Sequence, residues 1–346
     1  MIYIGDEFDW NKEDKVPASY LDNPNIERLK MYNLPVIDNV AVLFKSLNLS
    51  VANAKKFFYP TYRRTFLYRE FDLPKKKGGS RVISVPIPEL MSIQKAINSV
   101  ILNSFKMSRY CTGFKKNMSL VDNAKPHLGA KTLLKFDIHD FFGSITYKKV
   151  IKQFKFYGYG NKVSELLTLL CVDYKDRLPQ GAPTSPTLSN LVSLRMDKRI
   201  GEYCKKHNLV FTRYADDITI SSKNHLSKQE INQIHFILKE ILEDEGFSLN
   251  EEKTHCFYEG HKMKVTGVVI NDRLMKPDKI ILKEIDNALY YIGKYGLKSH
   301  LERINNVKEN YLNHLTGLMS FVYMINPNIG KKYMEIFNNI PKEKLE

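Results

Sequence analysis

Two runs of β-forming residues meet at a pair of carboxylates in the stretch Phe211-Thr212-Arg213-Tyr214-Ala215-Asp216-Asp217-Ile218-Thr219. The pattern predicts two strands, at 209–214 and 218–221, joined by a tight hairpin with both aspartates at its tip. Aspartate is common in turns for reasons of backbone geometry alone, so the pair by itself assigns no chemistry. Its meaning depends on what else the fold brings to the tip.

A third carboxylate, Asp137, lies near the end of the hydrophobic run at 132–138, which predicts a short buried strand. If this strand neighbours the hairpin in one sheet, Asp137 converges with Asp216 and Asp217. Like charges at short range are costly unless a positive group neutralises them, and neither tip contributes a Lys or Arg for that purpose. A divalent metal is the natural answer, because Mg²⁺ prefers oxygen ligands and paired ions about 3.5–4 Å apart serve polymerases.

The composition narrows the class of protein. The 346 residues include 53 Lys and Arg against 38 Asp and Glu, a formal charge of +15, and 43% of the residues are hydrophobic. This favours a packed protein over a disordered basic tail, with nucleic acid as the simplest partner and a membrane surface as the competing one. The absence of an 18-residue apolar run and the acidic start predict a cytoplasmic protein with no membrane segment. The four scattered cysteines favour neither a disulfide framework nor a zinc site.

The remaining periodicities predict helices and strands in mixed order, followed by a helical end. We expect a hairpin at 64–87 with a basic tip of lysines and two short final strands, at 254–258 and 262–270. Helices are expected at 37–47, from Ser50 to Tyr59, at 89–105, 146–157, 162–172, 184–207 and 227–245, and from Asp278 onward. The fold class is therefore an α+β core with a C-terminal helical appendage, built as two or three subdomains that share one cleft.

Three of these segments together resemble reverse transcriptases. The stretch at 211–219 resembles the Tyr-x-Asp-Asp signature, and the stretch at 136–145, with Asp137 second, is similar to the first aspartate motif. Between them, Leu178-Pro179-Gln180-Gly181-Ala182-Pro183-Thr184-Ser185-Pro186 resembles the loop-to-helix motif of that family. Three motifs in the family's order are far more specific than any one of them.

The resemblance implies a role for each matching residue. Asp137 and Asp216 would be the principal ligands of two Mg²⁺ ions, Asp217 the second member of the pair, and the Ile138 carbonyl an additional oxygen ligand. Phe142 would block a ribose 2′-hydroxyl and so select deoxynucleotides, the alternative being a core phenylalanine. Gln180 would contact the incoming nucleotide, the alternative being a plain turn.

Two basic positions are implied in the same way. Arg81, with Lys76 or Lys77 of the hairpin tip, would clamp the triphosphate of the incoming dNTP, and the competing interpretation is a solvated loop. Lys253 matches the lysine that lies near the departing pyrophosphate in the family, which makes it a candidate general acid or else a surface lysine.

Two short segments narrow the family to bacterial retron reverse transcriptases. Asn123-Ala124-Lys125-Pro126-His127 resembles the Asn-Ala-x-x-His segment of that group, and Val265-Thr266-Gly267 resembles its Val-Thr-Gly segment. We expect Asn123, His127, Val265, Thr266 and Gly267 to bind RNA. Such enzymes reverse transcribe a cognate structured noncoding RNA, starting from an internal guanosine 2′-hydroxyl. The product is branched RNA-linked single-stranded DNA, and with a partner effector protein they act in phage defence.

The implied architecture is a right hand of fingers, palm and small helical thumb. We expect an N-terminal extension at 1–29, fingers at 30–130, a palm with the catalytic aspartates and some interleaved fingers elements at 131–270, and an RNA-binding thumb at 271–346. Lysines and tyrosines of the C-terminal helices would bind the phosphate backbone and stack on nucleotides. These are Lys283, Tyr290, Tyr291, Lys294 and Tyr295.

Other functions compete with this interpretation. A group II intron-like or other bacterial reverse transcriptase keeps the same chemistry, but no maturase-like or zinc endonuclease domain follows the motifs. A polymerase fold kept as an idle RNA-binding scaffold would not need the costly set of Asp137, Asp216 and Asp217. A metal-dependent nuclease would need neither the Gln180 loop nor the Phe142 gate.

Overall fold

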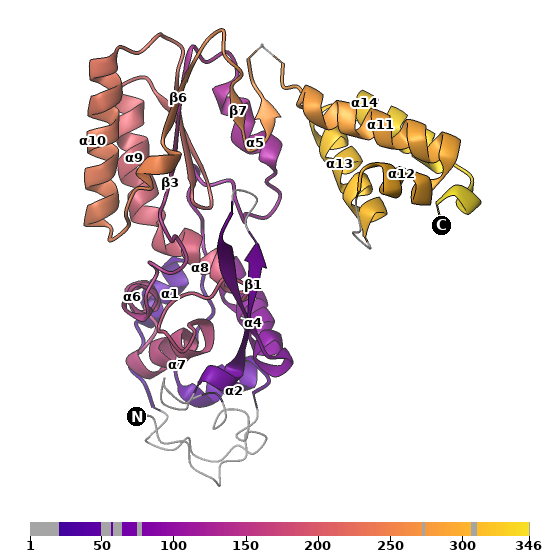
Figure 1. Cartoon of the computed structure of the whole chain (residues 1–346). Helices are drawn as coiled ribbons and strands as arrows, with labels where there is room; N and C mark the ends of the chain where they lie inside the picture. The colour runs from indigo at the N-terminus through magenta and orange to yellow at the C-terminus, as the bar shows by residue number, and fades with distance from the viewer. Residues whose placement is uncertain are drawn as a thin grey trace.

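The computed structural model describes residues 21–49, 57, 64–74, 78–271, 274–305 and 310–345. Figure 1 shows an elongated body, with the N-terminal helices at one end and a sheet at the other, and a separate helical arm attached beside the sheet. We call these parts the lower body, the sheet module and the C-terminal arm. None of the helices in the described ranges is long and apolar enough to cross a membrane.

The sheet module is built on a four-stranded antiparallel sheet of order β4-β5-β3-β6. Its central strand β3 is buried along nearly its whole length because helices cover one face and a second apolar cluster covers the other. Leu134 and Phe136 enter the main core, whereas Leu133 joins the second cluster, as the alternation of side chains along a strand requires. The elements are β3 (Thr132–Asp137), β4 (Val210–Tyr214), β5 (Asp217–Ser222), β6 (His255–Tyr258), α9 (Leu194–Lys206) and α10 (Lys228–Asp244).

The predicted helix at 227–245 is present as α10, and its sequence shows why it begins where it does. Ser227 and Glu230 form a capping box, in which each side chain accepts from the backbone N–H of the other residue. Ile234, Leu238, Ile241 and Leu242 then recur with helical spacing and enter the main core. In Figure 1, α10 and α9 lie on the same side of the sheet.

The lower body pairs the β1-β2 hairpin with helices from both sides of it in the sequence. Strand β2 runs antiparallel to β1 with Tyr68 opposite Pro86, as the pattern at 64–87 predicts. The lysine tip, including Lys76 and Lys77, and the helix expected from Ser50 lie outside the described residues. The elements are α1 (Ile26–Met31), α2 (Val40–Ser46), β1 (Tyr68–Pro74), β2 (Ser80–Pro86), α4 (Pro88–Val100), α6 (Tyr147–Tyr157) and α7 (Asn161–Cys171).

Two sequence predictions differ from the structure. The single helix expected at 184–207 is divided into α8 (Ser185–Val192) and α9, with the buried Ser193 between them, whose Oγ donates to the Ser189 carbonyl at 2.8 Å. Such a bond to the preceding turn competes with the helix's own pattern. The strand expected at 262–270 is instead a hairpin of β7 (Lys264–Val265) and β8 (Val268–Val269), because Thr266 and Gly267 both have positive φ and form the turn.

The C-terminal arm has an apolar core of its own. Helices α11 (Lys279–Tyr295), α12 (Leu297–Arg303), α13 (Tyr311–Ile325) and α14 (Pro327–Asn338) bury Leu315, Met319 and other residues among themselves. Asp278 caps α11 and is buried against Lys262 and Lys264, with which it forms ion pairs. These ion pairs join the arm to the small β7-β8 sheet.

Candidate catalytic carboxylate site

The three aspartates meet at one end of the four-stranded sheet. The register of β3 against β5 places Asp137 opposite Asp217, and Asp216 lies in the turn that precedes β5. Ala215 has φ +56°, which lets the turn be tight, and the Ile138 N–H donates to the Asp216 carbonyl at 3.0 Å. The convergence expected from two separate strands is therefore a consequence of one antiparallel pairing.

Burial and neighbouring negative charge disfavour the ionised forms of Asp216 and Asp217. Burial, followed by the charges of Asp217 and Asp137, raises the pKa of Asp216 above its ordinary value. Burial and the Asp137 charge likewise raise the pKa of Asp217, and Lys135 partly opposes this. Both carboxylates are thus held where their charged forms are disfavoured unless a cation joins them.

Lys253 supplies positive charge that neither aspartate tip contains. Its Nζ donates to Asp137 Oδ1 at 2.8 Å and to Oδ2 at 2.9 Å, and Asn250 Nδ2 donates to Oδ1 at 3.1 Å. The backbone N–H of Asn250 also donates to the Asp137 carbonyl at 2.8 Å, which fixes the segment after α10 against β3. The lysine lies 116 residues from its partner in the sequence, so no local pattern predicts the pair.

The donor set has the chemistry of a divalent-cation site. Across the described ranges, no three His, Cys, Asp or Glu side chains are arranged so that they could hold a metal ion together, and Lys253 engages both oxygens of Asp137. Yet the carboxylates of Asp216 and Asp217 are partly desolvated, repel each other and offer the hard oxygens that Mg²⁺ prefers. The carboxylates of Asp216 and Asp217 therefore fit a divalent cation, whereas the charge of Asp137 is balanced by Lys253.

The predicted nucleotide loop is attached to strand β2. The Gln180 carbonyl accepts from the Ser84 N–H at 2.8 Å, and the Gln180 side chain is half-buried. Gly181 has φ +131°, and a Cβ there would lie 2.9 Å from the Ser84 carbonyl oxygen, so only glycine fits. Arg81 lies on the same strand, exposed and paired with Leu73, whereas Lys77 lies outside the described residues.

Phe142 lies in an aromatic group that sequence reasoning missed. Its half-buried ring is 5.5 Å from the ring of Phe141 and 6.2 Å from that of Phe114, which is 6.2 Å from Tyr214. Phe114 is 44% exposed. Its φ is +57°, an unusual backbone conformation for a bulky residue. A Cβ on Gly113 would lie 2.7 Å from the Ala215 N, so this loop rests on the aspartate turn.

A buried ion pair holds the aspartate turn from behind. Arg213 and Asp197 are both fully buried, and the guanidinium donates to the two carboxylate oxygens at 2.7 and 2.9 Å. The remaining guanidinium nitrogen of Arg213, Nη1, donates to the Ala215 carbonyl at 2.9 Å. Asp197 comes from α9, and only the packing of α9 beside β4 brings it to the turn.

The Asn-Ala-x-x-His segment lies inside the sheet module. Asn123 and His127 are fully buried, and His127 hydrogen-bonds Ser221 Oγ at 2.7 Å through Nδ1 and Thr212 Oγ1 at 2.8 Å through Nε2. Burial lowers the pKa of His127 to about 3, so the ring is neutral. Direct RNA contact by these two side chains is therefore a wrong expectation, because they brace β4 and β5.

The Val-Thr-Gly segment meets the same region. Val265 is fully buried and so is also corrected as an RNA contact, Thr266 Oγ1 donates to the Leu120 carbonyl at 3.0 Å, and Gly267 is exposed. A Cβ on Gly267 would lie 3.3 Å from Phe321 of α13. The two segments lie on α5 (Leu120–Ala124) with the 3-10 helix Lys125–His127 and on the β7-β8 hairpin. Their apolar side chains form one cluster with Phe321 and Ile325 of the C-terminal arm, which is therefore docked on them.

Comparisons with known proteins give a consistent result. Residues 73–270 match the family model described as "Reverse transcriptase (RNA-dependent DNA polymerase)". The chain is 32% identical to the retron Ec86 reverse transcriptase of Escherichia coli over 94% of this chain and 96% of that protein. It is 29% identical to the retron Mx65 reverse transcriptase of Myxococcus xanthus, over 89% of this chain and 73% of that protein. For the retron Mx162 reverse transcriptase of the same organism the identity is 27%, over 96% and 73% respectively.

Proposed function

We propose a specific reaction for this chain, which belongs to the reverse transcriptase family and is an RNA-directed DNA polymerase of the bacterial retron type. It copies a cognate structured noncoding RNA from dNTPs, primed by an internal guanosine 2′-hydroxyl, and yields branched RNA-linked single-stranded DNA. The observation that carries the proposal is the convergence of Asp137, Asp216 and Asp217 at one sheet end, in a chain related to retron enzymes along most of its length.

In this proposal the three parts of the structure are the parts of a right hand. The lower body would be the fingers, at 30–130, with α6 and α7 interleaved from the palm range. The sheet module would be the palm, at 131–270, and it also takes in α5 from the end of the fingers range. The C-terminal arm would be the thumb, at 271–346. Residues 1–29 would be an N-terminal extension, whose described end enters α1 and buries Leu29 in the main core. The separate apolar core of the arm supports a boundary near Asp278, where the ion pairs with Lys262 and Lys264 form the joint.

The metal site would be formed by Asp137, Asp216 and Asp217, with the Ile138 carbonyl as a further oxygen. Two bound Mg²⁺ ions would supply activation of the attacking hydroxyl and neutralisation of the phosphate charge. The raised pKa values of Asp216 and Asp217 support this, because a bound cation offsets both the burial and the neighbouring carboxylate charges that raise them. Lys253, which here donates to both carboxylate oxygens of Asp137, would be the proton donor to the departing pyrophosphate.

Other side chains would hold the incoming nucleotide. Gln180 lies on a loop fixed to β2, and Arg81 lies exposed farther along that strand, where with Lys77 it would bind the triphosphate. The ring of Phe142 would exclude a ribose 2′-hydroxyl. Its contact with Phe114 supports this role, because a ring held by a neighbour blocks space more effectively than a mobile one.

The proposal also includes a cytoplasmic location and an effector protein partner that acts with the enzyme in phage defence. The effector partner rests on the resemblance to retron enzymes alone, whereas the location is the expectation drawn from the sequence pattern.

The test is to purify the protein from cells that carry its own locus and to treat the co-purifying nucleic acid separately with RNase and DNase. We expect a discrete single-stranded DNA that stays joined to a short RNA remnant. The DNA should be absent when Asp216→Ala and Asp217→Ala are combined. It should be present in Asp38→Asn, a control change at an exposed carboxylate away from the sheet end. RNA without attached DNA, together with extension of an added primer, would instead indicate a more general reverse transcriptase. RNA without attached DNA and without any primer extension would indicate an idle RNA-binding scaffold.

A further inference from the structure

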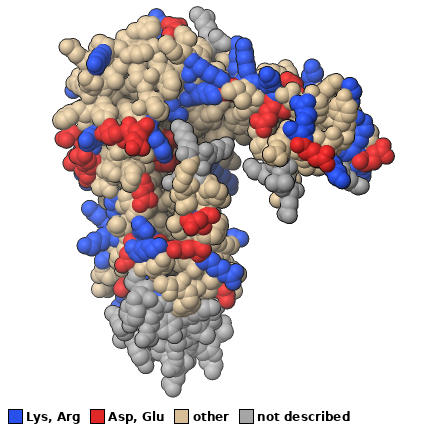
Figure 2. Space-filling model, in the orientation of Figure 1, with Lys and Arg blue, Asp and Glu red and all other residues tan. Residues whose placement is uncertain are grey.

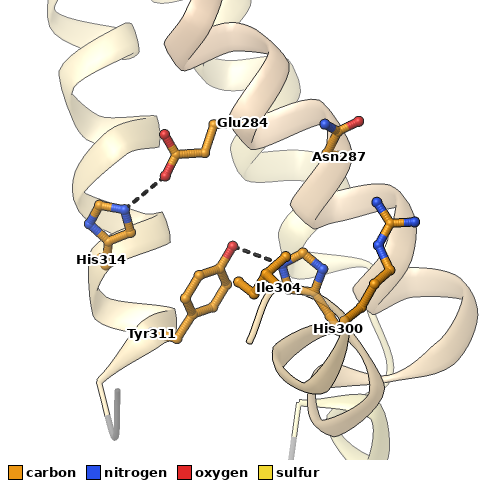
Figure 3. Close-up of a pocket in the computed structure, with 7 residues that line it drawn as sticks. Glu284, Asn287, His300, Ile304, Tyr311 and His314 are labelled. Atoms are coloured by element: carbon orange, nitrogen blue, oxygen red, sulfur yellow. Dashed lines mark hydrogen bonds and ion pairs between the residues drawn. The ribbon is translucent and has the colours of Figure 1, made fainter. Parts of the chain in front are cut away.

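A polar pocket of about 340 Å³ lies in the C-terminal arm, remote from the carboxylate site. Figure 3 shows Glu284 facing His314 and Tyr311 facing His300, with Asn287 farther along the helix that carries Glu284. Helix α11 contributes Glu284 and Asn287, α12 contributes His300 and Arg303, and α13 contributes Tyr311 and His314. A pocket of this size is large enough for a planar base and too small for a folded peptide element.

His300 is the strongest sign that the pocket receives a ligand. Its side chain is 3% exposed, and Nε2 lies 2.8 Å from the Tyr311 hydroxyl, while Nδ1 is buried without a hydrogen-bond partner. Burial and the nearby Arg303 charge lower the pKa of His300, so the ring is neutral. A buried polar atom left unpaired costs about 1–3 kcal/mol, so a ligand whose polar edge reaches Nδ1 as the ring shifts would recover that cost.

Aromatic rings continue from His300 along the wall of the arm. The ring of Tyr291 is stacked with that of His300 at 6.3 Å and with that of Tyr295 at 6.0 Å. The Arg303 guanidinium lies 3.4 Å from the centre of the Tyr291 ring. Stacked rings beside a guanidinium are the surface on which proteins hold unpaired nucleotides, because every base has a face that stacks and a phosphate that binds Arg.

The hydrogen-bonding groups of the pocket favour one base. Glu284 accepts from His314 Nε2 at 3.0 Å through Oε1, and a carboxylate retains further acceptor capacity beyond one such bond. The Asn287 amide, one turn along the same helix, can both donate and accept. Guanine presents two adjacent donors, N1–H and N2–H, beside the O6 acceptor, which suits a carboxylate next to an amide donor. Adenine would instead turn an acceptor toward the carboxylate.

We propose that this pocket binds a single unpaired guanine base of the RNA that the enzyme copies. This rests on the proposed function and deepens it, since it gives the arm a base-specific contact in addition to its charge. Figure 2 shows Lys and Arg side chains on the arm and where it meets the body, interspersed with acidic ones. That distribution suits backbone contacts on either side of one recognised base.

The test uses the full chain and a short RNA hairpin whose loop carries one 6-thioguanosine, which crosslinks on irradiation. Crosslinked peptides should map to α11, α12 or α13. A hairpin with unmodified guanine in that loop should compete about tenfold better than one with adenine there, as expected for one bidentate base contact. Glu284→Gln should remove that preference, whereas Glu302→Gln, the same change at an exposed residue of α12 outside the pocket lining, should keep it.

Three results would overturn the proposal. These are crosslinks only outside the arm, equal competition by guanine and adenine hairpins, and loss of the preference in Glu302→Gln as well as in Glu284→Gln. Competition by free GMP at the concentration at which the hairpin competes would assign the pocket to a nucleotide instead of RNA. Extension of an added primer by the unmodified protein tests the proposed function separately, so the two ideas can fail independently.

Discussion

The sheet end that holds the aspartates and the C-terminal arm are built on opposite principles. At the sheet end, backbone pairing sets the positions of Asp137 and Asp217, and the buried Arg213–Asp197 pair holds the turn between the strands. In the arm, half-exposed polar side chains project from helices that share a small core and join the body through Asp278. In our proposal, the chemistry that needs fixed carboxylates is placed on a sheet, whereas recognition of RNA is placed on helices.

The largest expected effect comes from a substitution that destabilises the sheet end and does not touch the arm. Asp197→Ala leaves the Arg213 guanidinium buried without its partner, and we expect it to lower the free energy of unfolding by about 3–5 kcal/mol. Urea unfolding followed by circular dichroism measures this, with Asp244→Asn, which breaks an exposed ion pair, as the control. Equal, small effects of the two changes would show that the buried pair does not hold the turn.

A second change breaks the joint and leaves the sheet end intact. Burial alone would raise the pKa of Asp278, but hydrogen bonds from Lys262 and Lys264 outweigh it and hold the pKa well below the ordinary value. Asp278→Asn should weaken the docking of the arm by about 1.5–3 kcal/mol, the range for hydrogen bonds to a charged group. Faster hydrogen exchange in β7, β8 and the start of α11, with unchanged exchange in β3 and β5, is the expected result.

The same joint has a defined pH dependence. Because the folded-state pKa of Asp278 is lowered, its contribution is complete above the ordinary aspartate pKa of about 4 and is lost as the pH falls through the lower folded value. Exchange protection of β7 and β8 should therefore be constant between about pH 5 and 8. A loss of protection within that range in the unmodified protein would contradict the assignment.

A smaller effect sharpens the description of the sheet end. The contact between the Phe114 and Phe142 rings stabilises the position of Phe142 by about 0.5–1.5 kcal/mol. Phe114→Ala removes this contact and should therefore reduce discrimination against ribonucleotides by about two- to tenfold. Phe142→Ala should reduce it further. Single-nucleotide incorporation of dNTP and rNTP gives both ratios, and Phe236→Ala, at an exposed ring on α10, is the control. Unchanged discrimination in Phe142→Ala would return that ring to the core.

The sequence predicts the sheet end far better than the arm, for a physical reason. The α+β right-hand fold is confirmed. The strands and the tight turn follow from local patterns, whereas the pairing of β3 with β5 that brings Asp137 to the turn joins distant segments and was implied by the resemblance. Contacts between distant segments carry no such signal, so the Lys253–Asp137 pair and the Phe114 loop were missed. Asn123 and His127 were expected to contact RNA but are fully buried, because a segment that marks a family need not touch its ligand.

The arm was predicted only as helices with basic and aromatic side chains. Tyr291 and Tyr295 were expected to stack on nucleotides, and the structure instead stacks these rings on each other and on His300. Their availability to RNA remains part of the proposal. Neither the pocket nor the unpaired His300 nitrogen follows from helical periodicity, because three helices must pack before the pocket exists.

The central claim is that Asp137, Asp216 and Asp217 form the metal-dependent site of a DNA polymerase. The most direct measurement is extension of a DNA primer on an RNA template with dNTPs while MgCl₂ is titrated, for the unmodified protein, Asp216→Asn and Asp38→Asn. We predict saturable Mg²⁺-dependent synthesis by the unmodified protein and Asp38→Asn, and no synthesis by folded Asp216→Asn. Synthesis by Asp216→Asn at the unmodified rate, or synthesis without any divalent cation, would contradict the account.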